Sequence, residues 1–183
     1  MKRAEGRIEI RLPERRRQPE SVVAHLGPTN SGKTHDALAF LAEQGRGVYA
    51  GPLRMLAQES HRRLAALLGE EQVGLITGEE RINEHAPVLC CTVEMAPGNG
   101  EVLVLDEVQW ADDEERGAAW TELLLAGDYR HIRLLGALDA LPLVRRHIAN
   151  IRSVLGAHAW VIESAPTLGY RITPQAMVRG APE

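Results

Sequence analysis

The sequence predicts an α/β domain of three layers, in which helices cover both faces of a mainly parallel central sheet. Short apolar runs alternate with longer amphipathic runs along the chain, as expected where strands and helices follow one another. Several of the short runs are apolar at every position, which is typical of strands buried on both faces in a parallel sheet. Because only 4% of the residues are aromatic, we expect aliphatic side chains to supply most of the core.

The individual elements are predicted from these runs and from the turn residues that bound them. Strands are expected at 21–26, 47–51, 72–77, 87–92, 101–106, 131–136 and 159–164, where apolar and β-branched residues gather. Helices are expected at about 32–44, 53–68, 114–126 and 139–150, where apolar residues recur with helical spacing.

The chain divides into three parts by composition. Residues 1–20 form a basic, proline-flanked arm, which we interpret as a solvated tail or as an RNA-contacting arm. Residues 21–150 carry the predicted domain, and residues 151–183 form an extension that packs on the same domain or serves as a linker. The formal net charge of -4 provides no global field for a polyanion, so any nucleic-acid contact must be local.

The apolar segments of the sequence bear on where the protein is located, and its two cysteines bear on disulfide and metal chemistry. No apolar run approaches the roughly 20 residues that cross a bilayer, and the N-terminus lacks the apolar middle of a secretory signal. We therefore expect a cytoplasmic protein without a membrane partner. Cys90 and Cys91 are neighbours on a predicted strand and point to opposite faces, so neither a disulfide between them nor a zinc site is expected.

The stretch GPTNSGKT, after the first predicted strand and before the first helix, matches the phosphate-binding loop pattern. Its glycines allow the backbone to curl around a phosphate, so that N–H groups and the helix N-terminus point at the negative oxygens. The expected nucleotide-binding residues are Gly27, Pro28, Thr29, Asn30, Ser31, Gly32, Lys33 and Thr34.

Lys33 and Thr34 are assigned separate roles within this loop. The chain contains two lysines and nineteen arginines, so it uses arginine for nearly all of its positive charges but lysine at this position. A compact ammonium fits the small phosphate cradle, whereas the broad planar guanidinium of arginine does not. We expect Lys33 to reach the outer phosphates and Thr34 to hold Mg²⁺.

A second acidic motif follows the predicted strand 101–106. The apolar run EVLVL ends at Asp106 and Glu107, with Gln109 two positions further on. Because the carboxyl ends of parallel strands share one edge of a sheet, this motif and the phosphate loop can meet there. Asp106 is expected to hold Mg²⁺, and Glu107 to orient or deprotonate the attacking water. Gln109 is placed to sense the nucleotide or to link it to another site.

The order and the residues of the motifs indicate which family of nucleotide-binding proteins the chain resembles. The series GPTNSGKT, GPLRMLAQE, TGEE, CTVEM, DEVQ, RGAAWTELLL and GALDALPLVR resembles the mitochondrial degradosome-type RNA helicases, the SUV family of DExH/DExQ superfamily 2 enzymes, along their first RecA-like domain. The resemblance covers about residues 21–150. It implies a RecA-like P-loop NTPase fold, ATP and Mg²⁺ as cofactors, and single-stranded RNA, or DNA, as partner.

The resemblance also implies a nucleic-acid path. The segments matching GPLRMLA, TGEE and CTVEM contact the nucleic-acid backbone in such helicases, where small polar groups and backbone N–H groups bind phosphates without reading bases. The RNA-contact candidates are Pro52, Leu53, Arg54, Thr77, Gly78, Thr92 and Glu94. Trp110 and Trp120 are interpreted as core residues or contacts to a further domain rather than as base-stacking platforms.

The chain departs from the family in its length. The family's helicases carry a second RecA-like domain, which closes the ATP site and contributes arginines worth about 10³ to 10⁵ in rate. We therefore expect a motor domain that is incomplete alone and takes its other half from a domain in trans or from another copy of itself. Two alternatives remain open, an ATP-binding interaction module without turnover and a thymidine kinase-like nucleoside kinase. The RNA target, the polarity of movement and the oligomeric state do not follow from the sequence.

Overall fold

The computed structural model describes residues 19–28, 31–146, 160–165 and 169–174 of the chain. Its strands are β1 Ser21–Leu26, β2 Gly47–Gly51, β3 Val73–Ile76, β4 Arg81–Ile82, β5 Val88–Thr92, β6 Asn99–Leu105, β7 Asp128–Gly136, β8 Trp160–Ala165 and β9 Gly169–Pro174. Its α-helices include α1 Lys33–Gln44, α2 Arg54–Leu68 and α3 Gly117–Ala126, and residues 141–146 are also helical. Short 3₁₀ helices are η1 Glu70–Gln72, η2 Val93–Met95, η3 Val108–Asp112 and η4 Leu138–Ala140.

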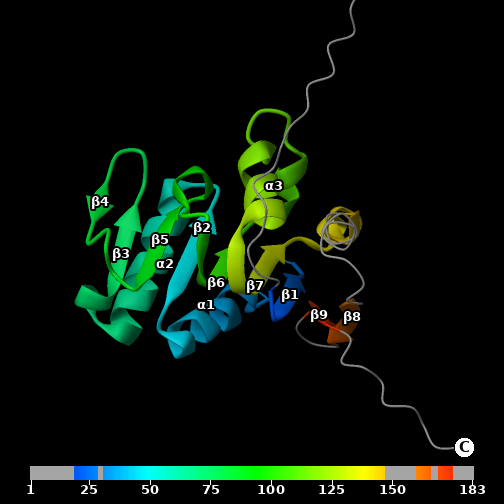
Figure 1. Cartoon of the computed structure of the whole chain (residues 1–183), viewed down its shortest axis with the longest axis horizontal. Helices are drawn as coiled ribbons and strands as arrows, with labels where there is room; N and C mark the ends of the chain where they lie inside the picture. Colours follow the sequence, from blue (N-terminus) through cyan, green and yellow to red (C-terminus); the bar gives the residue numbers. More distant parts are fainter. Residues whose placement is uncertain (1–18, 29–30, 147–159, 166–168, 175–183) are drawn as a thin grey trace, which may run out of the picture.

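The strands form one sheet in the order β4-β3-β5-β2-β6-β7-β1-β9-β8 (Figure 1). The pairings from β3 across to β1 are all parallel, whereas β4, β9 and β8 pair antiparallel. The mainly parallel sheet predicted from the sequence is therefore confirmed. All six parallel strands end at the same edge of the sheet, and the loops that follow them lie side by side there.

Helices cover both faces of this sheet, as a three-layer architecture requires. On one face, α1 and α2 bury Leu38, Leu41 and Leu64 against side chains such as Val104 of β6. On the opposite face, the buried residues of α3 and η3, which include Val108, Trp120 and Leu124, pack against the alternate positions of the same strands. Figure 1 shows α1 and α3 on opposite sides of the sheet.

Most predicted elements are found within a few residues of their expected bounds, and the exceptions have physical reasons. The helix expected from about residue 114 begins at Gly117, after a turn in which the carboxylate of Asp113 accepts the backbone N–H groups of Glu115 and Arg116 at 3.0 and 2.8 Å. The short β4 and the strand β9 were not predicted. The register pairs β9 with β1 through Val22 and Ile172, a long-range contact that no local pattern specifies.

Several expectations fall partly or wholly outside the described residues. Residues 1–18 of the predicted arm lie outside them, as does the second part of the helix expected at 139–150, of which 141–146 are described as helical. Cys90 and Cys91 are free thiols buried in β5. Within the described ranges, no helix is both long enough and apolar enough to cross a membrane.

Candidate functional site

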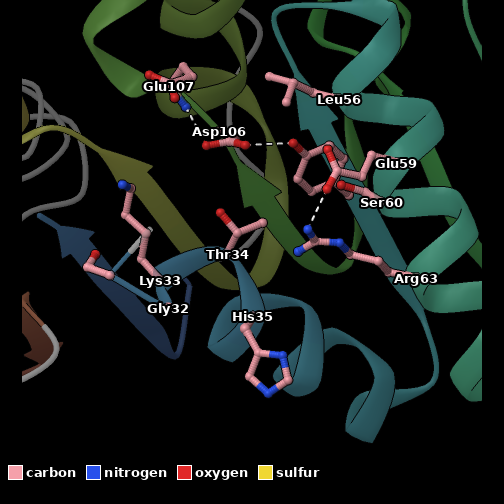
Figure 2. Close-up of a pocket in the computed structure, with 12 residues that line it drawn as sticks. Gly32, Lys33, Thr34, His35, Leu56, Glu59, Ser60, Arg63, Asp106 and Glu107 are labelled. Carbon is pink, nitrogen blue, oxygen red and sulfur yellow. Dashed lines mark hydrogen bonds and ion pairs between the residues drawn. The ribbon is translucent and has the colours of Figure 1, made fainter. Parts of the chain in front are cut away.

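The edge at which the parallel strands end carries a pocket of about 410 Å³ between the start of α1, the first turns of α2 and the end of β6 (Figure 2). Residues from both sequence motifs line it together. The lining residues are Ser31, Gly32, Lys33, Thr34, His35, Tyr49, Leu56, Glu59, Ser60, Arg63, Asp106 and Glu107. The phosphate-loop pattern and the acidic strand end, 72 residues apart from Thr34 to Asp106 in the chain, therefore meet at one site.

The glycine-rich loop ends where α1 begins. Gly32 is the N-cap of the helix and adopts a left-handed backbone with φ 85°, a conformation that glycine adopts without strain. The ammonium of Lys33 donates to the carbonyl oxygens of Gly27 and Pro28 at 3.2 and 3.0 Å. Thr29 and Asn30 lie outside the described residues. The first backbone N–H groups of α1, which have no partner within the helix, are a favourable place for an anion.

Asp106 is a buried carboxylate fixed from several directions. Only 5% of the residue is exposed. Its Oδ2 accepts the hydroxyl proton of Tyr49 at 2.6 Å, and its Oδ1 accepts the backbone N–H of Glu107 at 2.8 Å. Its own backbone N–H bonds to the carbonyl of Ala50, and its carbonyl accepts the indole N–H of Trp120. Burial raises the pKa of Asp106, although the hydrogen bonds from Tyr49 and from the backbone of Glu107 and the charge of Lys33 oppose the rise.

Tyr49 and Ser60 are site residues that the sequence alone did not indicate. Tyr49 is fully buried in β2 and Ser60 is 3% exposed on α2. Burial raises the pKa of Tyr49, and a hydrogen bond from Ser60 opposes that rise. The phenol is therefore neutral and donates to Asp106. The sequence held one indication of this role: Tyr49 places a hydroxyl group in an otherwise apolar strand, and a buried tyrosine hydroxyl needs a hydrogen-bond partner.

Glu107 and Gln109 form a bonded pair after the end of β6. Glu107 has φ 51° and ψ 51°, a left-handed backbone that is uncommon for a residue with a side chain and that often marks functional loops. The amide of Gln109 donates to the carboxylate of Glu107, and the carbonyl of Glu107 accepts the backbone N–H of Trp110 at 3.0 Å. Gln109 lies behind Glu107 and is not among the residues that line the pocket.

The RNA-contact candidates after β2 differ in their access to solvent. Pro52 is buried, Leu53 is 50% exposed, and Arg54 is exposed at the start of α2. Arg54 forms an ion pair with Glu79, and that pair links the loops after β2 and β3. A ligand at this edge would therefore meet the side chain of Leu53 and a neutralised Arg54.

Of the RNA-contact candidates after β3 and β5, the two threonines are buried, whereas the glycine and the glutamate are exposed. Thr77 is 2% exposed, and its hydroxyl oxygen accepts the backbone N–H groups of Glu79 and Glu80. Gly78 is exposed at the tip of the same loop. Thr92 is buried at the end of β5, and Glu94 is exposed and ion-paired with Arg116. The exposed groups in these two loops include Gly78 and the ion-paired carboxylates of Glu79 and Glu94.

Comparisons with known proteins identify a family and its members. A family model described as the DEXQ-box helicase domain of Suv3 matches residues 10–160. The mitochondrial ATP-dependent RNA helicase SUV3 of Saccharomyces cerevisiae is 43% identical over 142 residues, which are 73% of this chain and 19% of that protein. The mitochondrial DExH18 helicase of Arabidopsis thaliana is 40% identical over 144 residues, 76% of this chain and 18% of its own length. The chain thus spans about a fifth of these relatives.

The solved structures agree in fold. A hypothetical ATP-dependent RNA helicase from Sulfolobus tokodaii superposes with a TM-score of 0.55 at 15% identity, covering 72% of this chain and 45% of that one. At this identity the likeness supports the fold alone. The cytoplasmic location expected from the sequence is corrected by the relatives, which are mitochondrial proteins.

The buried carboxylate predicts a stability effect. Because the pKa of Asp106 is higher in the folded state, folding is favoured when the group is protonated, and this contribution is lost as pH rises through the folded pKa. Asp106→Asn removes this titration, so its melting temperature should change less between pH 4 and pH 8 than that of the wild type, by about 2–4 °C for each kcal/mol. Relative to the wild type, the variant should be more stable at pH 8 than at pH 4, and thermal unfolding followed by circular dichroism measures this.

Asp139→Asn is the matched control, since Asp139 is exposed and lies outside the pocket. Its melting temperature should follow the wild type across the pH range. A melting temperature of Asp106→Asn that changes with pH as much as that of the wild type would contradict the assignment of a raised pKa to Asp106.

Proposed function

The chain belongs to the family of the Suv3 DEXQ-box helicase domain, and from this premise we propose that it is the ATP-binding and ATP-hydrolysing motor domain of an ATP-dependent RNA helicase. One observation carries the proposal, the pocket that brings Gly32, Lys33 and Thr34 together with Asp106 and Glu107. A phosphate cradle beside two carboxylates is the arrangement that phosphoryl transfer to water requires.

ATP and Mg²⁺ are the proposed cofactors. The donor set fits Mg²⁺, which prefers oxygen ligands and is commonly held by one or two protein oxygens together with phosphates and water. The hydroxyl of Thr34 and the carboxylate of Asp106 both face the pocket. Each oxygen of Asp106 accepts one hydrogen bond and keeps further acceptor capacity for a metal-bound water. The bound ion would neutralise charge on the phosphates.

Separate roles in ATP hydrolysis are proposed for Lys33, Glu107 and Gln109. Lys33, which bonds to two carbonyl oxygens of its own loop, would exchange these partners for the outer phosphate oxygens. Glu107 would orient the attacking water and accept its proton, and Gln109 would hold the carboxylate of Glu107 through the bond described above. Gln109 therefore acts through Glu107 rather than on the nucleotide.

Single-stranded RNA, or DNA, is the proposed partner at the loops after β2, β3 and β5. The exposed backbone of Gly78 and the positions of Leu53 and Arg54 suit phosphate contacts that carry no base preference. We propose that a second RecA-like domain, in trans or from another copy, completes the ATP site, as the family resemblance implies. The proposed division is an arm at 1–20, the motor domain at 21–150 and an extension at 151–183.

The family assignment gives no support to a thymidine kinase-like activity. An ATP-binding module without turnover differs from the proposed motor domain only in hydrolysis, so that measurement separates the two. The relatives' mitochondrial location replaces the cytoplasmic one as the location we propose.

Lys33→Ala should weaken the binding of Mg·ATP. Charge-assisted hydrogen bonds are worth about 1.5–3 kcal/mol each, so the loss of more than one lowers the affinity by roughly 100-fold or more. Titration with a fluorescent ATP analogue measures the dissociation constant. Lys2→Ala, which removes the chain's other lysine, is the control and should bind as the wild type does. Unchanged affinity in Lys33→Ala would sink the site assignment.

Glu107→Gln should bind Mg·ATP as tightly as the wild type and lose turnover by about 10²- to 10⁴-fold, as expected for the loss of a general base. Steady-state phosphate release with and without single-stranded RNA measures this. Glu122→Gln, an exposed change on α3, is the control. Turnover at the wild-type rate in Glu107→Gln would remove Glu107 from its proposed role.

A further inference from the structure

Arg116, the residue immediately before α3, binds groups from two loops at the edge where the parallel strands end. Its Nε and one terminal nitrogen donate to the same carboxylate oxygen of Glu94 at 3.0 and 2.6 Å. The same terminal nitrogen donates to the backbone carbonyl of Pro52 at 2.8 Å. Arg116 therefore fixes the loop after β2 and the loop after β5 to one another.

The same guanidinium lies over two tryptophans of the segment that follows β6 and of α3. Its central carbon is 5.2 Å from the ring centroid of Trp110 and 5.6 Å from that of Trp120. The two rings stack with centroids 6.2 Å apart and planes inclined by 19°. A cation held over indole rings at this distance gains a favourable cation–π interaction.

Both tryptophans are hydrogen-bonded to the acidic motif of the pocket. The indole N–H of Trp120 donates to the backbone carbonyl of Asp106 at 3.1 Å, and the backbone N–H of Trp110 donates to the carbonyl of Glu107. A single tryptophan thus separates Arg116 from Asp106, and another separates it from Glu107. In the sheet, β2 lies between β5 and β6, so Arg116 joins the loops of three neighbouring strands.

We propose that Arg116 is a positioning residue that couples the occupancy of the nucleotide pocket to the nucleic-acid affinity of the loops after β2 and β5. The inference rests on the proposed function and deepens it. A shift of the segment after β6 would reach the guanidinium through Trp110 and Trp120, and from there the carbonyl of Pro52 and the carboxylate of Glu94. Arg116 also neutralises Glu94, an exposed negative charge on a surface proposed to bind phosphates.

The chemistry of the site calls for arginine. A planar guanidinium can lie against aromatic rings with its faces while its edge donates to two acceptors, whereas an ammonium offers a compact charge without that geometry. Lysine at this position would keep the charge near Glu94 but would lose the simultaneous bond to Pro52 and the contact with both rings. Arg116→Lys therefore separates the contribution of charge from that of geometry.

The test measures coupling, which is reciprocal between two binding sites. The affinity of the chain for a fluorescein-labelled oligo-uridine is determined by anisotropy at one salt concentration, with and without the non-hydrolysable analogue Mg·AMP-PNP. The ratio of the two dissociation constants is the coupling factor. In the wild type it should be about 5 or more. Arg116→Ala should lower the coupling factor to about 1. Arg116→Lys should restore only a small part of the wild-type coupling.

The control variant and a second readout separate positioning from folding. Arg130→Ala removes an exposed arginine that pairs with Glu20 and Glu101 near the start of β7 and should keep the wild-type coupling factor. Affinity for Mg·AMP-PNP without RNA should change by less than about twofold in both Arg116 variants. Their nucleotide-induced change in tryptophan fluorescence should differ from that of the wild type, because the cation leaves the two rings.

Each outcome decides between this inference and the proposed function. Coupling that persists in both Arg116 variants would overturn the inference, as would a wild type that binds RNA with a coupling factor of 1. A fall in nucleotide affinity without RNA that matches the loss of coupling would show a structural role only and would also overturn it. A wild type that binds Mg·AMP-PNP but no RNA would contradict the proposed function itself, and this inference with it.

Discussion

The structure of the site depends on how a negative charge is kept inside the sheet. A buried carboxylate is costly unless hydrogen bonds compensate it, and Asp106 receives them from Tyr49 on β2 and from the backbone of Glu107. Its backbone is fixed in turn by Ala50 on one side and Trp120 on the other. The carboxylate can keep this position only while β2, β6 and α3 hold their relative register, so the proposed metal ligand and the fold are specified together.

The order of the strands explains why the proposed functions gather at one edge. The phosphate loop follows β1, the acidic motif follows β6, and the nucleic-acid candidates follow β2, β3 and β5. Because these strands are parallel neighbours in one sheet, their loops share an edge without any need for long connections. Charge is compensated locally at this edge, as Arg54 pairs with Glu79 and Arg116 with Glu94. These two pairs reduce the net charge of the loops after β2, β3 and β5.

Much of this arrangement could be predicted from the sequence, since strand–loop–helix order and parallel pairing place Lys33 and Asp106 at the same edge. The tyrosine that binds Asp106 could not be predicted, because Tyr49 reaches the carboxylate only through tertiary packing. Ser60, which bonds to Tyr49, was missed for the same reason. Both residues lie in runs that indicate ordinary core. The start of α3 was predicted to within three residues, and the turn before it carries the bonds from the carboxylate of Asp113 to the backbone N–H groups of Glu115 and Arg116. The pairing of β9 with β1 depends on contacts between the two ends of the chain.

The most direct test of the account is the dependence of ATP affinity on Mg²⁺. If Asp106 and Thr34 hold the ion beside the phosphates, the wild-type chain should bind ATP more tightly with Mg²⁺ than in EDTA, as calorimetric titration measures. Asp106→Asn should keep the metal-free affinity and lose most of the gain from Mg²⁺. The same gain in Asp106→Asn as in the wild type would contradict the claim that this buried carboxylate serves the metal.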